Sequence, residues 1–361
     1  MAVAALLAFG LGLALRPLHR DAGGSAAPPT LADQIRTELA TRYYRPVPDR
    51  VLRLGSVNAM LAALDDPYTR YLSRGELRLA QRAVHEGFSG VGLTLLPGEK
   101  GLLVTRTQPG PAKLAGMRPG DTILAVDGAS VVSLPFDEAL GRIIGRAGSS
   151  VTMRVWRHGH TLTFRVVRRQ FTRPSVRWHL TSDGVGVIRI ERFSLRTSAL
   201  TRKAAAQLHG AGARALVLDL RGNPGGLLSQ AVGVASLFLE RGLTVAALGG
   251  AHREASLIYA RDGAKSRLPL AVLVDRGSAS AAEVVAGALS DHGRARVYGE
   301  RTYGKSLVQE IDRLPSGAAL KLTVATYRTP SGLDISRNGV RPDVVTAHPL
   351  ARALAALAAP A

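Results

Sequence analysis

The sequence predicts an α/β core that carries an inserted β domain and follows an N-terminal helical region. Three observations predict this fold class: residues 170–350 alternate strand-like and helix-like patterns, residues 86–169 hold short strands between tight turns, and residues 28–85 hold helical patterns. Alternating strands and helices are typical of a parallel α/β sheet, whereas closely spaced short strands are typical of a small β domain. A chain of 361 residues is long enough for two or three such domains.

The first segment, residues 1–27, contains an unbroken apolar run over residues 2–15. This run is shorter than the roughly 20 residues that a membrane span needs, and its length fits the core of a signal peptide. Ser25-Ala26-Ala27 supplies the small residues of a cleavage site. We therefore expect an extracytoplasmic protein, in a bacterial periplasm or cell envelope, with this segment either cleaved as a signal peptide or kept as a membrane anchor.

The helical region 28–85 shows two helical patterns, over 31–44 and 49–64. Arg45-Pro46-Val47-Pro48 separates them, because proline interrupts a helix. A further helix over 76–85 is expected to lead into the β domain. Within that domain, Asp127-Gly128 predicts a tight turn after a strand over 122–126.

The α/β core is predicted from apolar runs of strand length that alternate with longer helical patterns. The predicted strands are 185–190, 215–220, 244–248 and 270–274, and the predicted helices are 197–208, 228–239 and 279–289. Three closing strands are expected over 295–298, 307–311 and 319–327, and residues 351–361 are expected to form a C-terminal tail.

Composition excludes several kinds of chemistry. The chain has no Cys, so disulfides, thiol catalysis and thiolate metal sites are excluded. Its nine His residues lack zinc-ligand spacing, and we expect neither a metal nor an organic cofactor. The net charge of +20 is spread along the chain without a basic block, which argues against a nucleic-acid partner and leaves an attraction to anionic membranes open.

Two Ser residues and one Lys are candidates for catalysis. Ser278 and Ser280 lie where a buried strand turns into a helix, and the free N–H groups of that helix suit a nucleophile whose transition state gains an oxyanion. Lys305 is one of only six Lys among 47 cationic residues and lies between turns. Lys can act as a general base after burial, whereas Arg cannot. His292 also lies near in sequence, but no local motif pairs it with an Asp.

The middle segment carries a run of about twenty residues, 107–128, that resembles a PDZ domain. That family adds a peptide to a sheet edge as an extra strand and holds its terminal carboxylate on loop amides. The resemblance implies a tail-binding loop, which consists of Phe88, Ser89, Gly90, Val91 and Gly92. It also implies peptide or protein partners with free, nonpolar C-termini.

Several motifs together resemble the carboxy-terminal processing peptidases, also called tail-specific proteases. They are residues 64–72, which we expect to be helical, the PDZ run, 218–226, the Ser280 turn, the Lys305 turn and 339–344. The resemblance covers nearly the whole chain after residue 27. It implies a crotonase/Clp-like α/β core and a serine endopeptidase that uses a Ser/Lys dyad.

The same resemblance assigns roles to individual residues. Ser280 matches the nucleophile rather than Ser278, because Glu283 follows it by three residues as in the family. Lys305 matches the general base and Gln309 the residue that orients it. The remaining carried-over positions are a supporting Asp291 and an oxyanion hole formed by the amide of Ala281 with that of Gly225 or Gly226.

Three positions depart from the family pattern: Asp275, Ala282 and Ser306. The last follows the candidate base, where Gly is usual and a Cβ could stiffen the turn. The alternative function is a non-catalytic PDZ scaffold on a degenerate protease fold. The sequence leaves open an oligomeric state or an adaptor.

Overall fold

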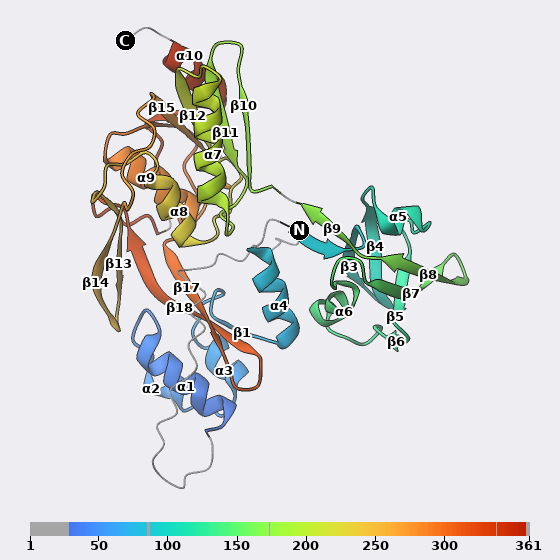
Figure 1. The fold of residues 1–361 in the computed structure, drawn as a ribbon. Coiled ribbons are helices and arrows are strands. Elements are labelled where there is room, and N and C mark those ends of the chain that lie inside the picture. The colour runs from blue at the N-terminus through green and yellow to red at the C-terminus, as the bar shows by residue number, and fades with distance from the viewer. Residues whose placement is uncertain (1–28, 85–86, 173, 337, 359–361) are drawn as a thin grey trace. The chain divides into compact units, whose positions relative to one another are not determined.

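The computed structural model describes residues 29–84, 87–172, 174–336 and 338–358 (Figure 1). Two compact units are formed, one by the described residues up to Leu72 together with those from Pro174 onward, and the other between Ser73 and Arg173. The apolar run 2–15 lies outside the described residues. Among the helices that are described, none has the length and apolarity to cross a membrane.

The first unit is built around a mostly parallel sheet. Its strands, in spatial order, are β10 (Val176–Leu180), β11 (Val185–Ile190), β12 (Ala215–Asp219), β15 (Leu270–Val274), β16 (Arg296–Gly299) and β19 (Val344–Val345). Only β10 runs antiparallel to its neighbour. Every residue of β12 and β15 is buried, as expected for a parallel sheet that is covered on both faces. The predicted parallel α/β core is confirmed.

A second, antiparallel sheet belongs to the same unit. Its strands are β1 (Arg70–Leu72), β18 (Ala319–Arg328), β13 (Thr244–Gly250) and β14 (Arg253–Tyr259), and β17 (Leu307–Arg313) also pairs with β18. The sequence patterns missed β1, which has three residues, and β14, which is almost wholly exposed. Strand β18 lies at the centre of this sheet and, as described below, contributes to the candidate site.

The helices of the first unit follow the predictions with three corrections. They are α1 (Leu31–Arg42), α2 (Asp49–Leu52), α3 (Val57–Ala62), α7 (Thr197–Gly210), α8 (Leu228–Ala235), α9 (Ala281–Asp291) and α10 (Pro349–Ala358). The helix predicted over 49–64 is broken, because Ser56 caps a new helix by accepting a hydrogen bond from the Ala59 amide. Residues 64–72, expected to be helical, form turns that end in β1. The expected tail is mostly helix α10, whose Ala353 is fully buried.

The second unit contains the predicted β domain. Its elements are α4 (Arg74–Ala83), β2 (Gly87–Gly90), β3 (Leu93–Gly98), β4 (Gly101–Thr107), α5 (Pro111–Leu114), β5 (Thr122–Val126), β6 (Ala129–Ser130), α6 (Phe136–Ile143), β7 (Ser150–Arg157), β8 (His160–Val167) and β9 (Arg169–Thr172). The main sheet has the order β3-β4-β5-β7-β8. The predicted turn at Asp127-Gly128 joins β5 and β6 with positive φ at both residues, as a type I′ turn requires.

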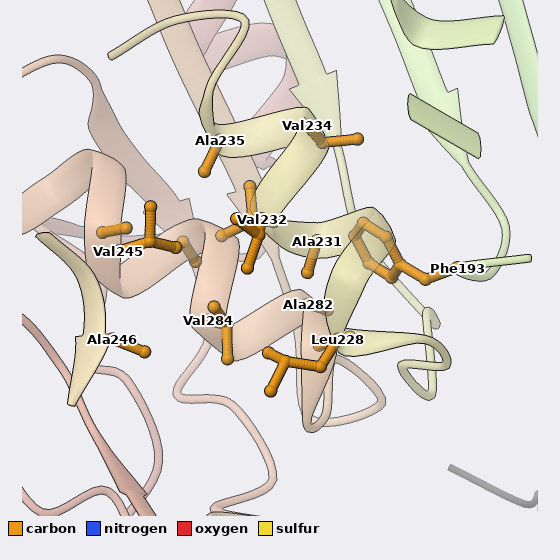
Figure 2. Close-up of a cluster of buried hydrophobic side chains, with 14 of the residues drawn as sticks. Phe193, Leu228, Ala231, Val232, Val234, Ala235, Val245, Ala246, Ala282 and Val284 are labelled. Atoms are coloured by element: carbon orange, nitrogen blue, oxygen red, sulfur yellow. The ribbon is translucent and has the colours of Figure 1, made fainter. Parts of the chain in front are cut away.

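Helix α9, which begins directly after Ser280, is held by an apolar core (Figure 2). Leu228, Ala231 and Val232 of α8 lie beside Ala282 and Val284 of α9, and strand β13 contributes to the same cluster. Burial of each Val or Leu side chain in this cluster stabilises the folded state by roughly 1.5–3 kcal/mol. This core therefore fixes the start of α9, where the predicted nucleophile lies.

Candidate active site

Ser280 lies on a strained turn between β15 and α9. Its backbone has φ 55° and ψ −115°, in a region that residues other than Gly rarely adopt. Such a conformation costs about 1–3 kcal/mol and is found where a turn must present a side chain at a defined point. The residue is 8% exposed and stands at the N-terminus of α9, where the helix dipole places partial positive charge.

Lys305 lies in the turn between β16 and β17 and is 6% exposed. Its Nζ is 4.1 Å from the centroid of the Tyr68 ring, which is a cation–π contact. Burial lowers the pKa of Lys305 to about 8, although the charges of Asp66 and Glu283 act in the opposite direction. A substantial neutral fraction near neutral pH is what a lysine needs to act as a base.

Glu283 connects the turn of Ser280 with that of Lys305. Its Oε2 accepts hydrogen bonds from the backbone N–H of Ser280 at 2.7 Å and of Lys305 at 2.9 Å. Its Oε1 accepts from the Thr302 hydroxyl at 2.5 Å and from the Gly304 N–H at 2.7 Å. The side chain is fully buried, and this burial raises the pKa of Glu283 against the lowering effect of its hydrogen bonds.

Tyr327 of β18 connects the same two residues through their carbonyls. Its hydroxyl oxygen is 2.9 Å from the carbonyl oxygen of Ser280 and 3.0 Å from that of Lys305, so its one hydrogen is shared between the two carbonyls. The Tyr327 N–H also donates to the carbonyl of Ser306, at 2.8 Å. Two residues that are 25 positions apart in the sequence are therefore brought together by two shared partners.

The glycine turn after β12 packs against the Ser280 turn. A Cβ on Gly225, whose φ is +98°, would lie 2.8 Å from the Ala279 carbonyl oxygen and from Ser280 Cβ. The Gly225 N–H donates to Asn223 Oδ1 at 2.8 Å. Among the described residues, the N–H groups of Gly226 and Ala281 form no hydrogen bond, so both are free to donate to a bound group.

Gln309 is only 1% exposed on β17, and neither its Oε1 nor its Nε2 has a hydrogen-bond partner among the described residues. The contact expected between Gln309 and Lys305 is thus not formed in this structure. Gln309 was expected to reach the Lys305 amine because residues four apart on a strand lie on the same face. Lys305 instead lies before β17 begins, so that spacing does not govern where its side chain points. A buried amide without hydrogen-bond partners is costly, and such groups are rare in native proteins.

The alternative catalytic candidates have structural partners. The Ser278 hydroxyl is fully buried and donates to the Leu220 carbonyl at 2.8 Å. His292 Nε2 is 2.7 Å from the Thr244 carbonyl oxygen, at the far end of α9 from Ser280. Asp291 is also at that end, about 15 Å along the helix, and accepts a hydrogen bond from the Ser331 N–H. The structure therefore does not bring Asp291 or His292 to Ser280.

The tail-binding loop predicted at Phe88–Gly92 spans β2 and the two residues before β3. The carbonyl of Val91 accepts from the Ala112 N–H, whereas the Ser89 hydroxyl is buried without a partner among the described residues. Gly92 has φ +85°, and a Cβ there would lie 2.9 Å from the Phe171 ring. Strand β3 is at the edge of its sheet, so its outer side is free of strand partners within the second unit.

Several residues that surround the candidate dyad were not identified from the sequence. Asp66 accepts hydrogen bonds from three hydroxyls and one amide, and Tyr68 lies under the Lys305 amine. Lys321 of β18 is 4% exposed, and burial with the charges of Lys305 and Arg70 lowers the pKa of Lys321 to about 7. The only sequence signal for Asp66 and Tyr68 was their place in a motif that resembles the family. Within the described residues, no group of three His, Asp or Glu side chains could hold a metal ion.

Comparisons with known proteins agree with this arrangement. Residues 184–346 match peptidase family S41, and residues 103–157 match the PDZ domain. The chain is 33% identical over 310 residues to the "Probable CtpA-like serine protease" of Staphylococcus haemolyticus, a match that covers 85% of this chain and 62% of that protein. It is 34% identical over 314 residues to the protein of the same name in Staphylococcus aureus, which covers 86% and 63%. The chain thus spans less than two thirds of the length of these relatives.

A solved structure extends the comparison to the fold. The photosystem II D1 C-terminal processing protease superposes with a TM-score of 0.57 at 31% sequence identity. The match covers 88% of this chain and 92% of that one. The resemblance inferred from the motifs is confirmed: the chain belongs to peptidase family S41 and contains a PDZ domain.

Proposed function

We propose that the chain is a serine endopeptidase of the carboxy-terminal processing type, with Ser280 as nucleophile and Lys305 as general base. The observation that carries this proposal is that Glu283 and Tyr327 each bond to both residues, around a lysine whose pKa is lowered by burial. The names of the similar proteins, which are proteases, support the same activity.

In the proposed reaction, neutral Lys305 takes the proton of the Ser280 hydroxyl as Oγ attacks a peptide carbonyl. The C–N bond then breaks, and the protonated Lys305 gives its proton to the leaving amine. The neutral Lys305 amine next removes a proton from water as the water attacks the acyl-enzyme carbonyl. When the C–Oγ bond breaks, Lys305 returns that proton to Ser280 Oγ and the acid product is released. Gln309 would orient the Lys305 amine, and this contact would satisfy its buried amide.

The oxyanion would be held by backbone N–H groups at the start of α9 and in the glycine turn. Within the part of the chain that the structure describes, the N–H of Ala281 has no competing partner, and neither has that of Gly226. The N–H of Gly225 already donates to Asn223 Oδ1, which favours Gly226 as the second donor. Such preorganised donors contribute about 2.7–4 kcal/mol each to transition-state stabilisation.

The PDZ domain would select substrates by their free, nonpolar C-terminal tails. A tail would pair with the outer side of β3, and the loop amides near Gly90–Gly92 would bind its carboxylate. We further propose that the protein acts outside the cytoplasm, because the apolar run 2–15 has the length of a signal-peptide core.

The test compares turnover of a peptide substrate by four proteins. Ser280→Ala and Lys305→Ala should each lose turnover on the order of 10³-fold or more while keeping their fold, since each removes a group that acts in the transition state. Lys203→Ala, on the exposed face of α7, is the matched control and should retain full turnover. If pure Ser280→Ala protein hydrolyses the peptide as fast as the unmodified protein, the assignment is refuted. If the unmodified protein is itself inactive, the result favours the scaffold alternative.

A further inference from the structure

We propose that Glu283 is a positioning residue that holds the Ser280 turn and the Lys305 turn in one fixed geometry, with Tyr327 as its counterpart on the carbonyls of the same two residues. This inference rests on the proposed function and adds two residues to it. Neither residue would touch the substrate. Both would act by setting where the nucleophile and the base stand.

The hydrogen bonds of Glu283 are divided between the two turns. One donor, the Ser280 amide, comes from the nucleophile turn, and three come from the base turn: the Thr302 hydroxyl and the amides of Gly304 and Lys305. Hydrogen bonds to an ionised carboxylate are short and about twice as strong as neutral ones. Because each carboxylate oxygen already accepts two of them, Glu283 has little capacity left to bind substrate or transfer a proton.

Tyr327 completes the connection without adding charge. Its hydroxyl shares one hydrogen between the carbonyls of Ser280 and Lys305, at 2.9 and 3.0 Å, and so bridges the two turns at a second pair of atoms. Its ring belongs to β18, the central strand of the antiparallel sheet. The separation of the two turns is therefore tied to a rigid element rather than left to two loops.

The effect of the Glu283 charge on Lys305 indicates that Glu283 aids catalysis by positioning the two turns, not by its charge. Its negative charge raises the pKa of Lys305 and so opposes the formation of the neutral base. A buried carboxylate also carries a large desolvation penalty. A residue that hinders the base electrostatically can aid catalysis only through the geometry that its hydrogen bonds impose.

Two separable consequences follow for Glu283→Gln. The amide offers only one acceptor atom in place of two, so the two turns lose part of their connection, and a displacement on the order of 1 Å lowers kcat about 100-fold. Removal of the negative charge also shifts the acid limb of the pH–rate profile to lower pH. Among the described residues, the other titratable groups near Lys305 are Asp66, Tyr68, Tyr327 and Lys321, and the substitution leaves all of them in place.

Tyr327→Phe tests the connection between the two turns without changing any charge near Lys305. It keeps the ring and removes only the hydroxyl, so kcat should fall about tenfold with the acid limb unmoved. The matched controls are Glu240→Gln and Tyr259→Phe, both at exposed side chains, which should leave kcat and the limb unchanged. KM should stay within twofold in all four variants, because neither Glu283 nor Tyr327 is expected to contact the substrate.

The experiment measures kcat, KM and the acid limb for the unmodified protein and the four variants, with thermal unfolding as a check on folding. A folded Glu283→Gln protein with unmodified kcat would overturn the proposal, and so would a lower kcat with an unshifted limb. If Glu283→Gln does not fold, the decision passes to Tyr327→Phe, and unmodified kcat there overturns it. Absence of Ser280-dependent turnover in the unmodified protein would instead refute the proposed function itself.

Discussion

Peptide hydrolysis should depend on pH through the deprotonation of Lys305. The burial of this side chain determines the pH at which half of the molecules hold the neutral amine. Burial lowers the pKa of this amine from an ordinary 10.5 to about 8. At pH 7 about one molecule in ten would then hold the neutral base, compared with about one in 3,000 for an exposed lysine. The buried position therefore raises the amount of active protein at pH 7 about 300-fold.

The assay is kcat/KM for one peptide between pH 5.5 and 9.5. Since the neutral base is required, the rate should rise tenfold per pH unit below pH 8 and then level, so that at pH 6 it is about 100-fold below the plateau. Thermal unfolding at pH 6 controls for loss of the fold, and Lys203→Ala should give the same profile. An acid limb with its midpoint near pH 6.5 would indicate a histidine base, and a midpoint near pH 10.5 would indicate an exposed lysine. Either result would refute the reasoning.

Three further predictions concern the glycine turn, the second buried lysine and the substrate tail. Gly225→Ala should lower stability by about 1–3 kcal/mol and reduce turnover, because its φ is positive and a Cβ there would lie 2.8 Å from Ser280 Cβ. The control is Gly210→Ala, where a Cβ would have no atom within 4 Å, and it should leave thermal unfolding unchanged. Lys321→Met should stabilise the protein about 2–3 kcal/mol more at pH 6 than at pH 9, as measured by denaturant unfolding. Between pH 7 and 10.5 the unfolded chain holds a proton that the native state releases, so native stability rises with pH through this window, and an equal gain at both values would contradict the lowered pKa. Amidation of a substrate's C-terminus should slow cleavage several-fold, because it removes the carboxylate that the PDZ loop would bind. Equal cleavage rates for the free-acid and amidated peptides would exclude selection by the tail.

The sequence predicted the parts of this fold that depend on local patterns. Strands β11 and β15 have the predicted bounds, because a continuous apolar run between turn residues has few alternatives in an α/β protein. The Ser280 turn could also be predicted, since an apolar strand, a short polar link and a helical pattern follow one another directly. The helix predicted over 49–64 was wrong because the cap at Ser56 interrupts a pattern that otherwise continues.

The surroundings of the candidate dyad depend on long-range contacts and could not be read in this way. Tyr327 donates to a residue 47 positions earlier in the chain, and nothing in its own strand pattern marks its hydroxyl as functional. Glu283 was visible only as a register mark three residues after Ser280, although its carboxylate joins two turns. Pattern analysis identifies which elements exist, whereas these bonds depend on how the elements pack.

The balance of charges around Lys305 explains how burial can govern its pKa with two carboxylates nearby. Asp66 accepts hydrogen bonds from the hydroxyls of Tyr43, Thr69 and Thr323 and from the Tyr68 amide. Glu283 likewise accepts four, so each negative charge is spread over several donors. Because neither carboxylate forms an ion pair with the amine in this structure, their attraction for its proton is weaker than the desolvation that opposes protonation. If either set of donors were removed, the freed carboxylate would hold the proton on Lys305 more tightly, and the base would be lost at neutral pH.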